Sequence, residues 1–203
     1  KMTLFYESMW EEESNKSRKI EVGKLFFQER RQNIIGSWKS FLDQQKQDLL
    51  PSNFNRENHN LVFYCSSEDE FEGISEEWNN PLNSNQLGIL LKIANWIKSK
   101  NMHLYLRMHP NQSEMNAMYL GDFEQLNEFD EVTVINPDSE ISSYALMDAC
   151  DKVITYGSTT GVEALFSNKP SILVNKALHW NLKGMIKPNN WEELKDLILD
   201  IEL

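Results

Sequence analysis

From residue 61 onward the chain alternates short apolar segments with amphipathic segments, and this alternation restricts its fold more than any other feature. The apolar segments predict strands, and the longer segments between them carry apolar residues at helical spacing. The predicted strands cover 61–65, 103–108, 132–135, 152–155 and 171–174, and the predicted helices 85–99, 114–129, 141–149, 160–167 and 191–201. Strands that alternate with helices form a parallel sheet wrapped on both faces. The sequence therefore predicts an α/β, Rossmann-like domain.

Residues 1–58 do not follow this pattern and are strongly polar. Apolar residues recur at roughly helical spacing over residues 25–50, which predicts one long helix there. Pro51 and the Asn-rich segment that follows it predict the end of this helix. We therefore expect a polar linker with a packing helix over residues 1–58, and a single domain over residues 59–203.

The composition excludes several functional classes. A formal net charge of −11 argues against nucleic acid as a partner, because a duplex binder needs a basic face. The same charge disfavours an anionic membrane surface, although a local basic region can exist within an acidic whole. No apolar run approaches the ~18 residues of a membrane helix, and we find no signal segment. Because no motif pairs Cys65 with Cys150, we expect a cytoplasmic protein.

Polar residues follow four of the predicted strands. Their segments are 66–71, 107–111, 136–139 and 156–161. The carboxyl ends of parallel strands lie at one edge of the sheet, and ligands of open α/β sheets bind at this edge. A purely structural domain would not need four polar strand ends. The pattern therefore predicts a nucleotide site.

The segment Gly157-Ser158-Thr159-Thr160-Gly161 joins a predicted strand directly to a predicted helix. Amide groups at a helix start, with hydroxyls beside them, suit a phosphate oxygen. A simple helix cap is the alternative, but a cap needs one hydroxyl residue and this turn has three. Glu163 follows one turn later, where it can meet a sugar hydroxyl or compensate the helix dipole. Because the chain has neither Gly-x-Gly-x-x-Gly nor a Walker loop, NAD and P-loop chemistry are not expected.

The segment Arg107-Met108-His109-Pro110-Asn111 ends another strand with a cation and an imidazole. A lone His is usually an ordinary surface imidazole, but His109 follows an apolar strand between Arg107 and Pro110. His109 is therefore the predicted catalytic residue, because an imidazole at this place can stabilise the negative charge on a departing phosphate. Arg107 can assist it or can pair with a nearby carboxylate. No metal site is expected. The acids 68–70 are typical of a solvated loop, and His59, His103 and His179 lack ligand spacing.

Three motifs occur in an order that resembles capsule polysaccharide biosynthesis proteins: Ser66-Ser67-Glu68-Asp69-Glu70-Phe71, Arg107-Met108-His109-Pro110-Asn111 and Tyr156-Gly157-Ser158-Thr159-Thr160-Gly161-Val162-Glu163-Ala164-Leu165. This family is similar to bacterial CMP-sugar glycosyltransferases of GT-B architecture, which include Kdo transferases and some sialyltransferases. Their shared marks are a His-Pro pair and a Ser-Ser or Ser-Thr pair. Here these correspond to His109-Pro110 and Ser158-Thr159. The similarity covers residues 61 to 200.

The resemblance implies the C-terminal, donor-binding half of a transferase that makes a bacterial surface polysaccharide, capsule or lipopolysaccharide. His109 would contact the donor phosphate and help the leaving group depart. Ser158 and Thr159 would bind that phosphate, Glu163 would approach the ribose, and the 136–139 loop would border the base. The full set of implied donor contacts is Arg107, Pro110, Asn111, Gly157, Ser158, Thr159, Thr160, Glu163, Ser66, Ser67, Asn136 and Ser139.

The resemblance also sets the expected ligands and partners. The donor, a CMP-activated sugar, would be a substrate, with no cofactor and no metal. The acceptor would be a glycan or glycolipid. GT-B enzymes bind it mainly in an N-terminal domain, which residues 1–58 are too short to form, and a catalytic carboxylate often comes from that domain. This chain alone is therefore expected to be a poorly active half of the enzyme. Peripheral association with the inner membrane, through other chains, is expected as well.

Three other functions remain open at the level of the sequence. A nucleotide-sugar 2-epimerase shares the GT-B architecture and would normally prefer UDP. A CDP-polyol phosphotransferase uses a similar scaffold and also releases CMP. A non-catalytic module of a capsule assembly complex would bind no nucleotide. The transferred sugar, the acceptor, the anomeric outcome and the oligomeric state are open as well.

Overall fold

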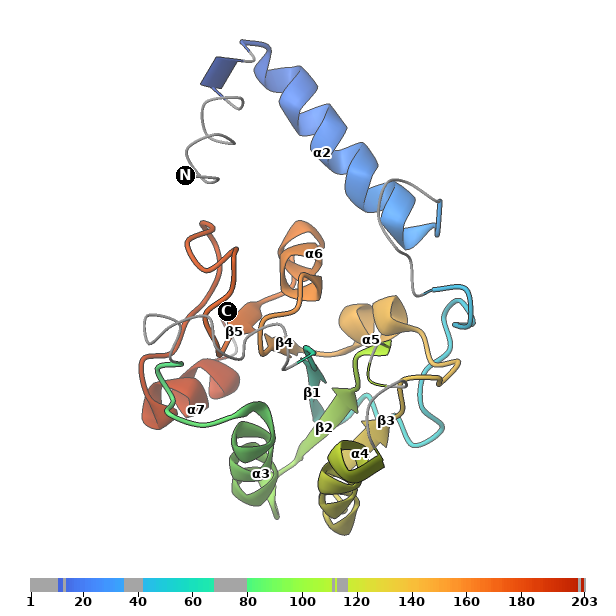
Figure 1. The fold of residues 1–203 in the computed structure, drawn as a ribbon, viewed down its shortest axis with the longest axis vertical. Coiled ribbons are helices and arrows are strands. Elements are labelled where there is room, and N and C mark those ends of the chain that lie inside the picture. The colour runs from blue at the N-terminus through green and yellow to red at the C-terminus, as the bar shows by residue number, and fades with distance from the viewer. Residues whose placement is uncertain are drawn as a thin grey trace. The chain divides into compact units, whose positions relative to one another are not determined.

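The computed structural model describes residues 11–12, 14–34, 42–67, 80–110, 112, 117–200 and 202. The chain divides into two compact units, Lys1–Asp43 and Gln44–Leu203. The first contains the long helix α2, and the second contains the sheet (Figure 1).

The helices and strands from residue 59 onward match the sequence prediction in type and order. Most bounds agree within about two residues, the usual uncertainty of an element's end. Residues 114–116 of the predicted helix over 114–129 lie outside the described residues, and the rest forms a short α-helix followed by a 3₁₀ turn. In chain order the elements are α2 (Lys16–Arg31), β1 (His59–Tyr64), α3 (Gln86–Ile97), β2 (Met102–Arg107), α4 (Ala117–Glu124), η4 (Gln125–Glu128), β3 (Val132–Ile135), α5 (Ser143–Ala149), β4 (Lys152–Thr155), α6 (Thr160–Phe166), β5 (Ser171–Leu173) and α7 (Trp191–Leu199).

The sheet has five strands in the order β3-β2-β1-β4-β5, and every neighbouring pair is parallel. The chain builds outward from β1 through β2 to β3, and then crosses back to place β4 on the other side of β1. Strand order therefore reverses between β1 and β4. In open α/β sheets this reversal opens a crevice at the carboxyl ends of the two strands, and ligands bind there. The expected Rossmann-like sheet is confirmed.

Helices cover both faces of the sheet, because successive side chains of a strand point to opposite faces. On one face Leu61 and Phe63 of β1 pack with α3, η4 and α7. On the other face Val62 and Tyr64 pack with α5 and α6. Helices α3 and α7 contribute apolar stripes to the first of these cores, as the helical spacing of their apolar residues predicts. The result is a three-layer domain with both faces of the sheet buried (Figure 1).

The segment 44–58 belongs to the sheet unit, whereas the sequence prediction assigned it to the N-terminal region. Phe54 stacks on Tyr105 of β2 with ring centroids 5.0 Å apart, and Leu50 packs against the same core. The carbonyl of Leu49 accepts a hydrogen bond of 2.9 Å from the amide of Ser142. The compact unit therefore begins at Gln44 and not at residue 59, because these apolar side chains complete one face of the sheet.

The prediction of one helix over residues 25–50 was wrong. Helix α2 begins earlier, at Lys16, and ends at Arg31. Asn33 follows with a φ of 55°, and the amides of Asn33 and Ile34 bond back to the carbonyls of Arg30 and Glu29 at 3.1 and 2.9 Å. This is a Schellman termination, in which a left-handed residue, here an Asn, closes the helix. Residues 42–50 form turns, and residues 35–41 lie outside the described part.

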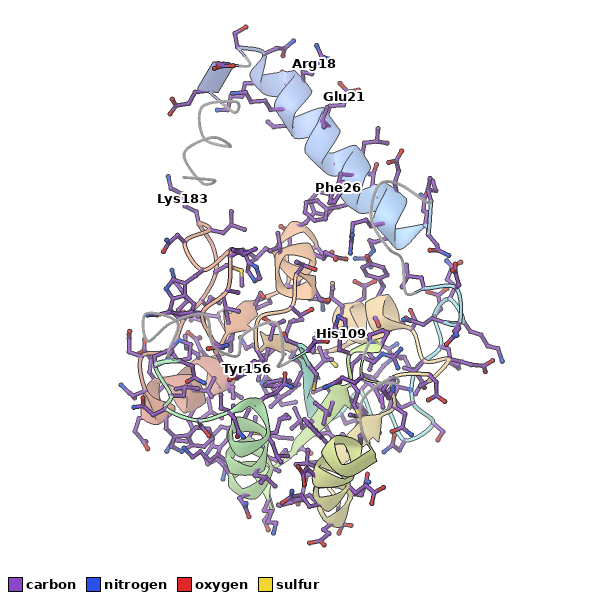
Figure 2. All side chains as sticks on the ribbon, in the orientation of Figure 1. Arg18, Glu21, Phe26, His109, Tyr156 and Lys183 are labelled. Carbon is purple, nitrogen blue, oxygen red and sulfur yellow. The ribbon has the colours of Figure 1, made fainter. Side chains whose placement is uncertain are left out.

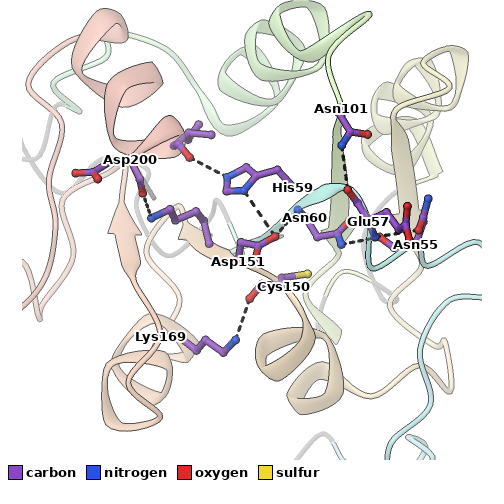
Figure 3. Close-up of polar contacts among 11 residues, drawn as sticks. Asn55, Glu57, His59, Asn60, Asn101, Cys150, Asp151, Lys169 and Asp200 are labelled. Atoms are coloured by element: carbon purple, nitrogen blue, oxygen red, sulfur yellow. Dashed lines mark hydrogen bonds and ion pairs between the residues drawn. The ribbon is translucent and has the colours of Figure 1, made fainter. Parts of the chain in front are cut away.

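At the amino ends of the strands a polar network joins β1, β4 and α7 (Figure 3). The Asp151 carboxylate accepts a hydrogen bond of 2.7 Å from the amide of Asn60 and lies 3.7 Å from Nδ1 of His59. Nε2 of the same imidazole lies 2.9 Å from the carbonyl oxygen of Ile198. His59 therefore has a structural role, at the edge of the sheet opposite to the predicted site.

Two further sequence expectations concern membranes and cysteines. Among the described residues, no helix combines the length and the apolar character needed to cross a membrane. Cys65 and Cys150 are both buried, but they belong to cores on opposite faces of the sheet and form no disulfide. Burial raises the pKa of the Cys150 thiol well above its ordinary value.

Candidate functional site

The register of the sheet brings the predicted site segments to one edge. Tyr64 at the end of β1 is paired with Arg107 on β2 and with Thr155 on β4. Two residues beyond this row the chain reaches Ser66, His109 and Gly157, one from each of three adjacent strands. His109 and Tyr156 lie on opposite sides of the end of β1 in Figure 2. The predicted clustering of polar strand ends is thus what the topology produces.

The turn between β4 and α6 offers three adjacent amide donors. Within the described part of the chain, the N–H groups of Gly157, Ser158 and Thr159 have no acceptor. The Ser158 hydroxyl accepts a bond of 3.3 Å from the amide of Thr160, so one hydroxyl does act as a cap. Because α6 has only seven residues, any affinity of this turn for an anion comes from these local N–H groups and hydroxyls. In this geometry one hydroxyl of the turn can cap α6 while the amides of the turn bind a phosphate, so the two interpretations do not exclude each other.

Ser66 follows β1, the strand on the other side of the strand reversal from this turn. Gln86, at the start of α3, fixes its backbone: the Gln86 side chain accepts 2.8 Å from the Ser66 amide and donates 3.2 Å to the Ser66 carbonyl. Both residues are buried, and the Ser66 hydroxyl has no hydrogen-bond partner among the described residues. A buried hydroxyl without a hydrogen-bond partner is uncommon in folded proteins. At the end of β1, an oxygen of a bound ligand would satisfy it.

Gln86 is a site residue that the sequence analysis missed. It occupies the same helical stripe as the buried residues Leu90, Ile93 and Ile97. A polar side chain on an apolar stripe signals a buried hydrogen bond, since an unpaired amide there costs about 1–3 kcal/mol. This signal was present in the sequence. Its target, the backbone of Ser66, follows only from the packing of α3 against β1.

Gly161 sets how closely α6 approaches the sheet. A Cβ at this position would lie 2.9 Å from Oγ1 of Thr155 on β4 and 3.1 Å from Oγ of Ser171 on β5. Both hydroxyls are buried and lack hydrogen-bond partners in the described part. The second glycine of the turn is therefore required for packing, and it determines where the amides at 157–159 lie relative to the strand ends.

Arg107 supports the neighbouring loop. It is buried, and its guanidinium donates to the carbonyl oxygens of Asn136 and Ser139 at 2.8 and 3.3 Å. Burial lowers the pKa of Arg107, while the proximity of Tyr64 and Asp138 opposes this shift. These two bonds join Arg107 to backbone carbonyls, and its predicted contact with the donor stays a prediction. The guanidinium holds the 136–139 loop at the carboxyl edge of the sheet.

Glu163 lies on the first turn of α6 and is buried. The hydroxyl of Tyr144, on α5, donates a hydrogen bond to its Oε2. Tyr144 is another residue that sequence reasoning missed, because the contact joins two helices and nothing in their spacing reveals it. The carboxylate is thus held in one position beside the amide-rich turn.

The segment after β2 is the least completely described of the predicted site. His109 is half-buried, and its amide donates a hydrogen bond of 2.6 Å to the side-chain oxygen of Gln112, which closes the turn through Pro110. Asn111 lies outside the described residues, as do the acids 68–70. Within the described ranges no group of three or more His, Cys, Asp and Glu side chains is placed to hold a metal ion.

A family comparison agrees with the motifs that cluster at this edge. The model of the capsule polysaccharide biosynthesis protein family matches residues 77–195, which is more than half of the chain. This chain belongs to that family. The match spans α3 to α7 and includes the turn at 157–161 and the His109-Pro110 pair. No curated protein sequence matches the chain.

Solved structures with the same fold include two transferases. The structure described as Thermosulfurimonas dismutans KpsC, beta Kdo 2,4 transferase, has a TM-score of 0.56 at 13% identity and aligns with 92% of this chain and 56% of its own. The KpsC beta Kdo 2,7 transferase of the same organism has a TM-score of 0.50 at 16% identity, over 90% of this chain and 50% of its own. The chain thus spans about half the length of these proteins.

An epimerase shares the fold as well. The UDP-GlcNAc 2-epimerase of Methanocaldococcus jannaschii has a TM-score of 0.51 at 13% identity, and it covers 73% of this chain and 39% of its own. At such low identity these similarities establish the architecture, a Rossmann-like domain of the kind found in GT-B glycosyltransferases and epimerases. They confirm the expected fold class, and the family model confirms the expected family.

Proposed function

We propose that the chain is the nucleotide-sugar donor-binding domain of a bacterial surface-polysaccharide glycosyltransferase, with a CMP-activated sugar as its donor. The proposal is supported by membership of the capsule polysaccharide biosynthesis family. It rests on one structural observation above the others. The amides at 157–159 and the buried Ser66 hydroxyl, which have no hydrogen-bond partner among the described residues, flank the reversal of strand order between β1 and β4.

In this proposal the donor phosphate lies at the 157–160 turn. The amides of Gly157, Ser158 and Thr159 would donate to its oxygens, together with the hydroxyl of Thr159 or Thr160. N–H groups that need no reorganisation are an effective way to hold an anion in a partly dehydrated site. The hydroxyls of Ser66 and Ser67 would complete this contact from the end of β1. No metal is needed to balance the phosphate in such an arrangement.

The other predicted residues take roles that fit their places at the same edge. His109, at the end of β2, would donate its imidazole N–H to the phosphate oxygen that gains an electron pair as the bond to the sugar breaks. Glu163, held by Tyr144, would accept a hydrogen bond from a ribose hydroxyl. The 136–139 loop, held by Arg107, would border the base. Arg107 would therefore act on the donor through the loop and not by contact.

The proposal also extends to the acceptor and to the part of the active site that lies outside this chain. The acceptor would be a glycan or glycolipid, bound mainly by a separate N-terminal domain, and the protein would act in the cytoplasm. The hydroxyl of the acceptor would bond to the anomeric carbon and release its proton to a base. Since this chain spans about half of the transferases that share its fold, we expect it to bind nucleotide but to turn over poorly.

The proposal is tested by thermal unfolding in the presence of CMP, CDP, UMP, UDP and NAD. A ligand at a hundred times its dissociation constant stabilises the folded state by about 2.7 kcal/mol, which corresponds to a rise in Tm of roughly 5–10 °C for a domain of this size. We expect cytidine nucleotides to give this rise. His109→Ala and Ser158→Ala should reduce it, whereas Ser52→Ala, an exposed hydroxyl on the 44–58 segment, should not.

Other outcomes would favour the alternatives. Protection by UDP in preference to CMP would support an epimerase or a UDP-sugar transferase, in line with the fold shared with the 2-epimerase. Protection by no nucleotide would support the non-catalytic assembly module. A CDP-polyol phosphotransferase would also be protected by CMP, and it is distinguished by assaying transfer from a CDP-polyol in place of a CMP-sugar.

A further inference from the structure

The loop of residues 136–139, which we propose to border the nucleotide base, leads into the first turn of α5. A short segment from the start of the sheet unit, residues 45–49, lies against this stretch. The segment comes directly after the boundary between the two compact units, and Figure 1 shows it, in cyan, beside α5. Two parts of the chain that are far apart in the sequence therefore meet at the edge of the proposed site.

Two backbone hydrogen bonds join this segment to the residues that follow the loop. The amide of Lys46 donates to the carbonyl of Glu140 at 2.8 Å. The amide of Ser142 donates to the carbonyl of Leu49 at 2.9 Å. The Lys46 ammonium group also lies 2.6 Å from the Glu140 carboxylate, but both side chains are exposed, and an exposed ion pair contributes little. The attachment therefore depends on the backbone bonds and on one further side chain.

That side chain is Gln45. Its Oε1 accepts a hydrogen bond of 2.7 Å from the amide of Ser143, the first residue of α5. The amides of a first helical turn have no acceptor within the helix, so the acceptor must come from elsewhere. The Ser142 hydroxyl serves the amide of Ala145 at 3.1 Å. Gln45 serves the amide of Ser143, and it thus caps α5 from a distant part of the chain.

The backbone of Ser143 is held on its other side as well. Its carbonyl accepts a hydrogen bond of 2.6 Å from the hydroxyl of Tyr64, at the end of β1. Arg107 holds the 136–139 loop itself through two of its carbonyls. Arg107 therefore fixes the part of the stretch that follows β3, and Gln45 fixes the part that enters α5.

We infer that Gln45 is a positioning residue for the nucleotide base. It acts through the amide of Ser143 and the loop before it, and not by contact with the donor. A loop that leaves its place lowers the affinity for the base, because affinity falls with the populated fraction of the competent conformation. The phosphate turn at 157–160 follows another strand, β4, so its amides do not depend on this bond. Because the 136–139 loop borders the base only in the proposed function, this role of Gln45 rests on that proposal.

The test compares CMP with ribose 5-phosphate, which lacks the base, by isothermal titration calorimetry on the 203-residue chain. Gln45→Ala leaves the partly buried amide of Ser143 without its acceptor, and it should raise the Kd of CMP about threefold to tenfold. The Kd of ribose 5-phosphate should change by less than about twofold, because effects at separate sites are independent. A merely structural loss would weaken both ligands alike.

Two more variants identify the group that acts. Gln45→Glu keeps an acceptor oxygen at the same distance from the backbone, and a carboxylate accepts an amide N–H at least as well as a carboxamide does. It should therefore restore the affinity for CMP. The matched control is Gln47→Ala, which changes an exposed glutamine two residues further along the same segment. This variant should bind both ligands like the unchanged chain.

The outcomes separate the role of Gln45 from the proposed function. If the unchanged chain does not bind CMP, the proposed function is wrong and the role of Gln45 falls with it. If the unchanged chain binds both ligands, the role of Gln45 alone is overturned by an unchanged affinity for CMP in Gln45→Ala, by an equal loss for both ligands, or by the same loss in Gln47→Ala. Failure of Gln45→Glu to restore the affinity would overturn it too, because the acceptor oxygen would not be the group that acts. So would binding of CMP without binding of ribose 5-phosphate, because the phosphate turn would then not bind independently of the base.

Discussion

Replacing Gly161 by Ala tests whether the turn at the carboxyl edge depends on the close approach of α6 to the sheet. The added Cβ would lie 2.9 Å from Oγ1 and 3.3 Å from Cγ2 of Thr155, and 3.1 Å from Oγ of Ser171. These atoms belong to two adjacent strands in the buried centre of the domain, so they cannot turn away into solvent. Helix α6 must therefore shift outward, and the amides at 157–159 must move with it.

The expected cost follows from two opposing effects. Inserting a methyl group into a well-packed core destabilises a protein by typically 1–3 kcal/mol. Alanine, however, is favoured over glycine within a helix by up to about 1 kcal/mol. Because the shortest contact lies below 3.0 Å, we expect the steric term to dominate. The net loss of unfolding free energy should be about 1–2 kcal/mol.

Urea unfolding measures this loss, and a double-mutant cycle identifies its cause. Thr155→Ala removes two of the three atoms nearest to the new Cβ. In that background Gly161→Ala should cost nothing or should stabilise, which gives a coupling energy of about 1–3 kcal/mol. The matched control is Gly121→Ala on α4, where a Cβ meets nothing within 4 Å and the helix propensity of alanine acts alone. This control should be stabilised.

Either of two results would refute this reasoning. If Gly161→Ala raised the urea midpoint as much as Gly121→Ala does, with an unchanged m-value, the contact between α6 and the strands would not be tight. A coupling energy near zero with Thr155→Ala would lead to the same conclusion. If the cycle behaves as expected, Gly161→Ala should also reduce protection by nucleotide, since the displaced amides are the proposed phosphate donors.

Two further predictions concern buried polar groups. Tyr144→Phe removes the hydrogen bond to the Glu163 carboxylate and should lower the unfolding free energy by about 1–2 kcal/mol in urea titration. An unchanged midpoint would mean that this bond contributes nothing. The second concerns Cys150, whose thiol pKa is raised by burial above the ordinary value of 9.0. The unfolded chain releases this proton first, so stability is complete below about pH 9 and should fall above it by up to about 1.4 kcal/mol per pH unit. Cys150→Ala should flatten that slope between about pH 9 and pH 10, and an identical slope would exclude the thiol as its source.

The regular part of the fold was predictable because each element carries its own periodic pattern. The strands that end at Ile135 and Thr155 were predicted with the bounds observed, since buried strands in a parallel sheet read as short apolar runs between polar residues. The edge at which polar residues gather also followed from the sequence. All strands of such a sheet point the same way, so polar residues that follow strands share one edge.

The N-terminal region shows where local patterns fail. Apolar spacing favoured a helix across residues 25–50, but Asn33 adopts a left-handed conformation that closes α2 two residues after Arg31. Likewise the segment 44–58 is polar overall and reads as a linker, yet Leu50 and Phe54 complete one face of the sheet. Whether a few apolar residues pack on a distant strand depends on the surface that the strand offers, and local sequence does not encode that surface.

The sequence by itself determined the order and type of the elements from residue 59, the edge of the sheet that carries the site, and the residue types available there. Only the tertiary structure decided how those residues are used. Because α3 packs on β1, the side chain of Gln86 forms hydrogen bonds with the backbone of Ser66. Because β2 lies beside β3, the guanidinium of Arg107 donates hydrogen bonds to the carbonyls of the 136–139 loop. The physical reason is that periodicity reports which face of an element is buried, whereas a hydrogen bond between distant elements requires a donor and an acceptor to meet within about 3 Å. That distance is set only when the layers pack.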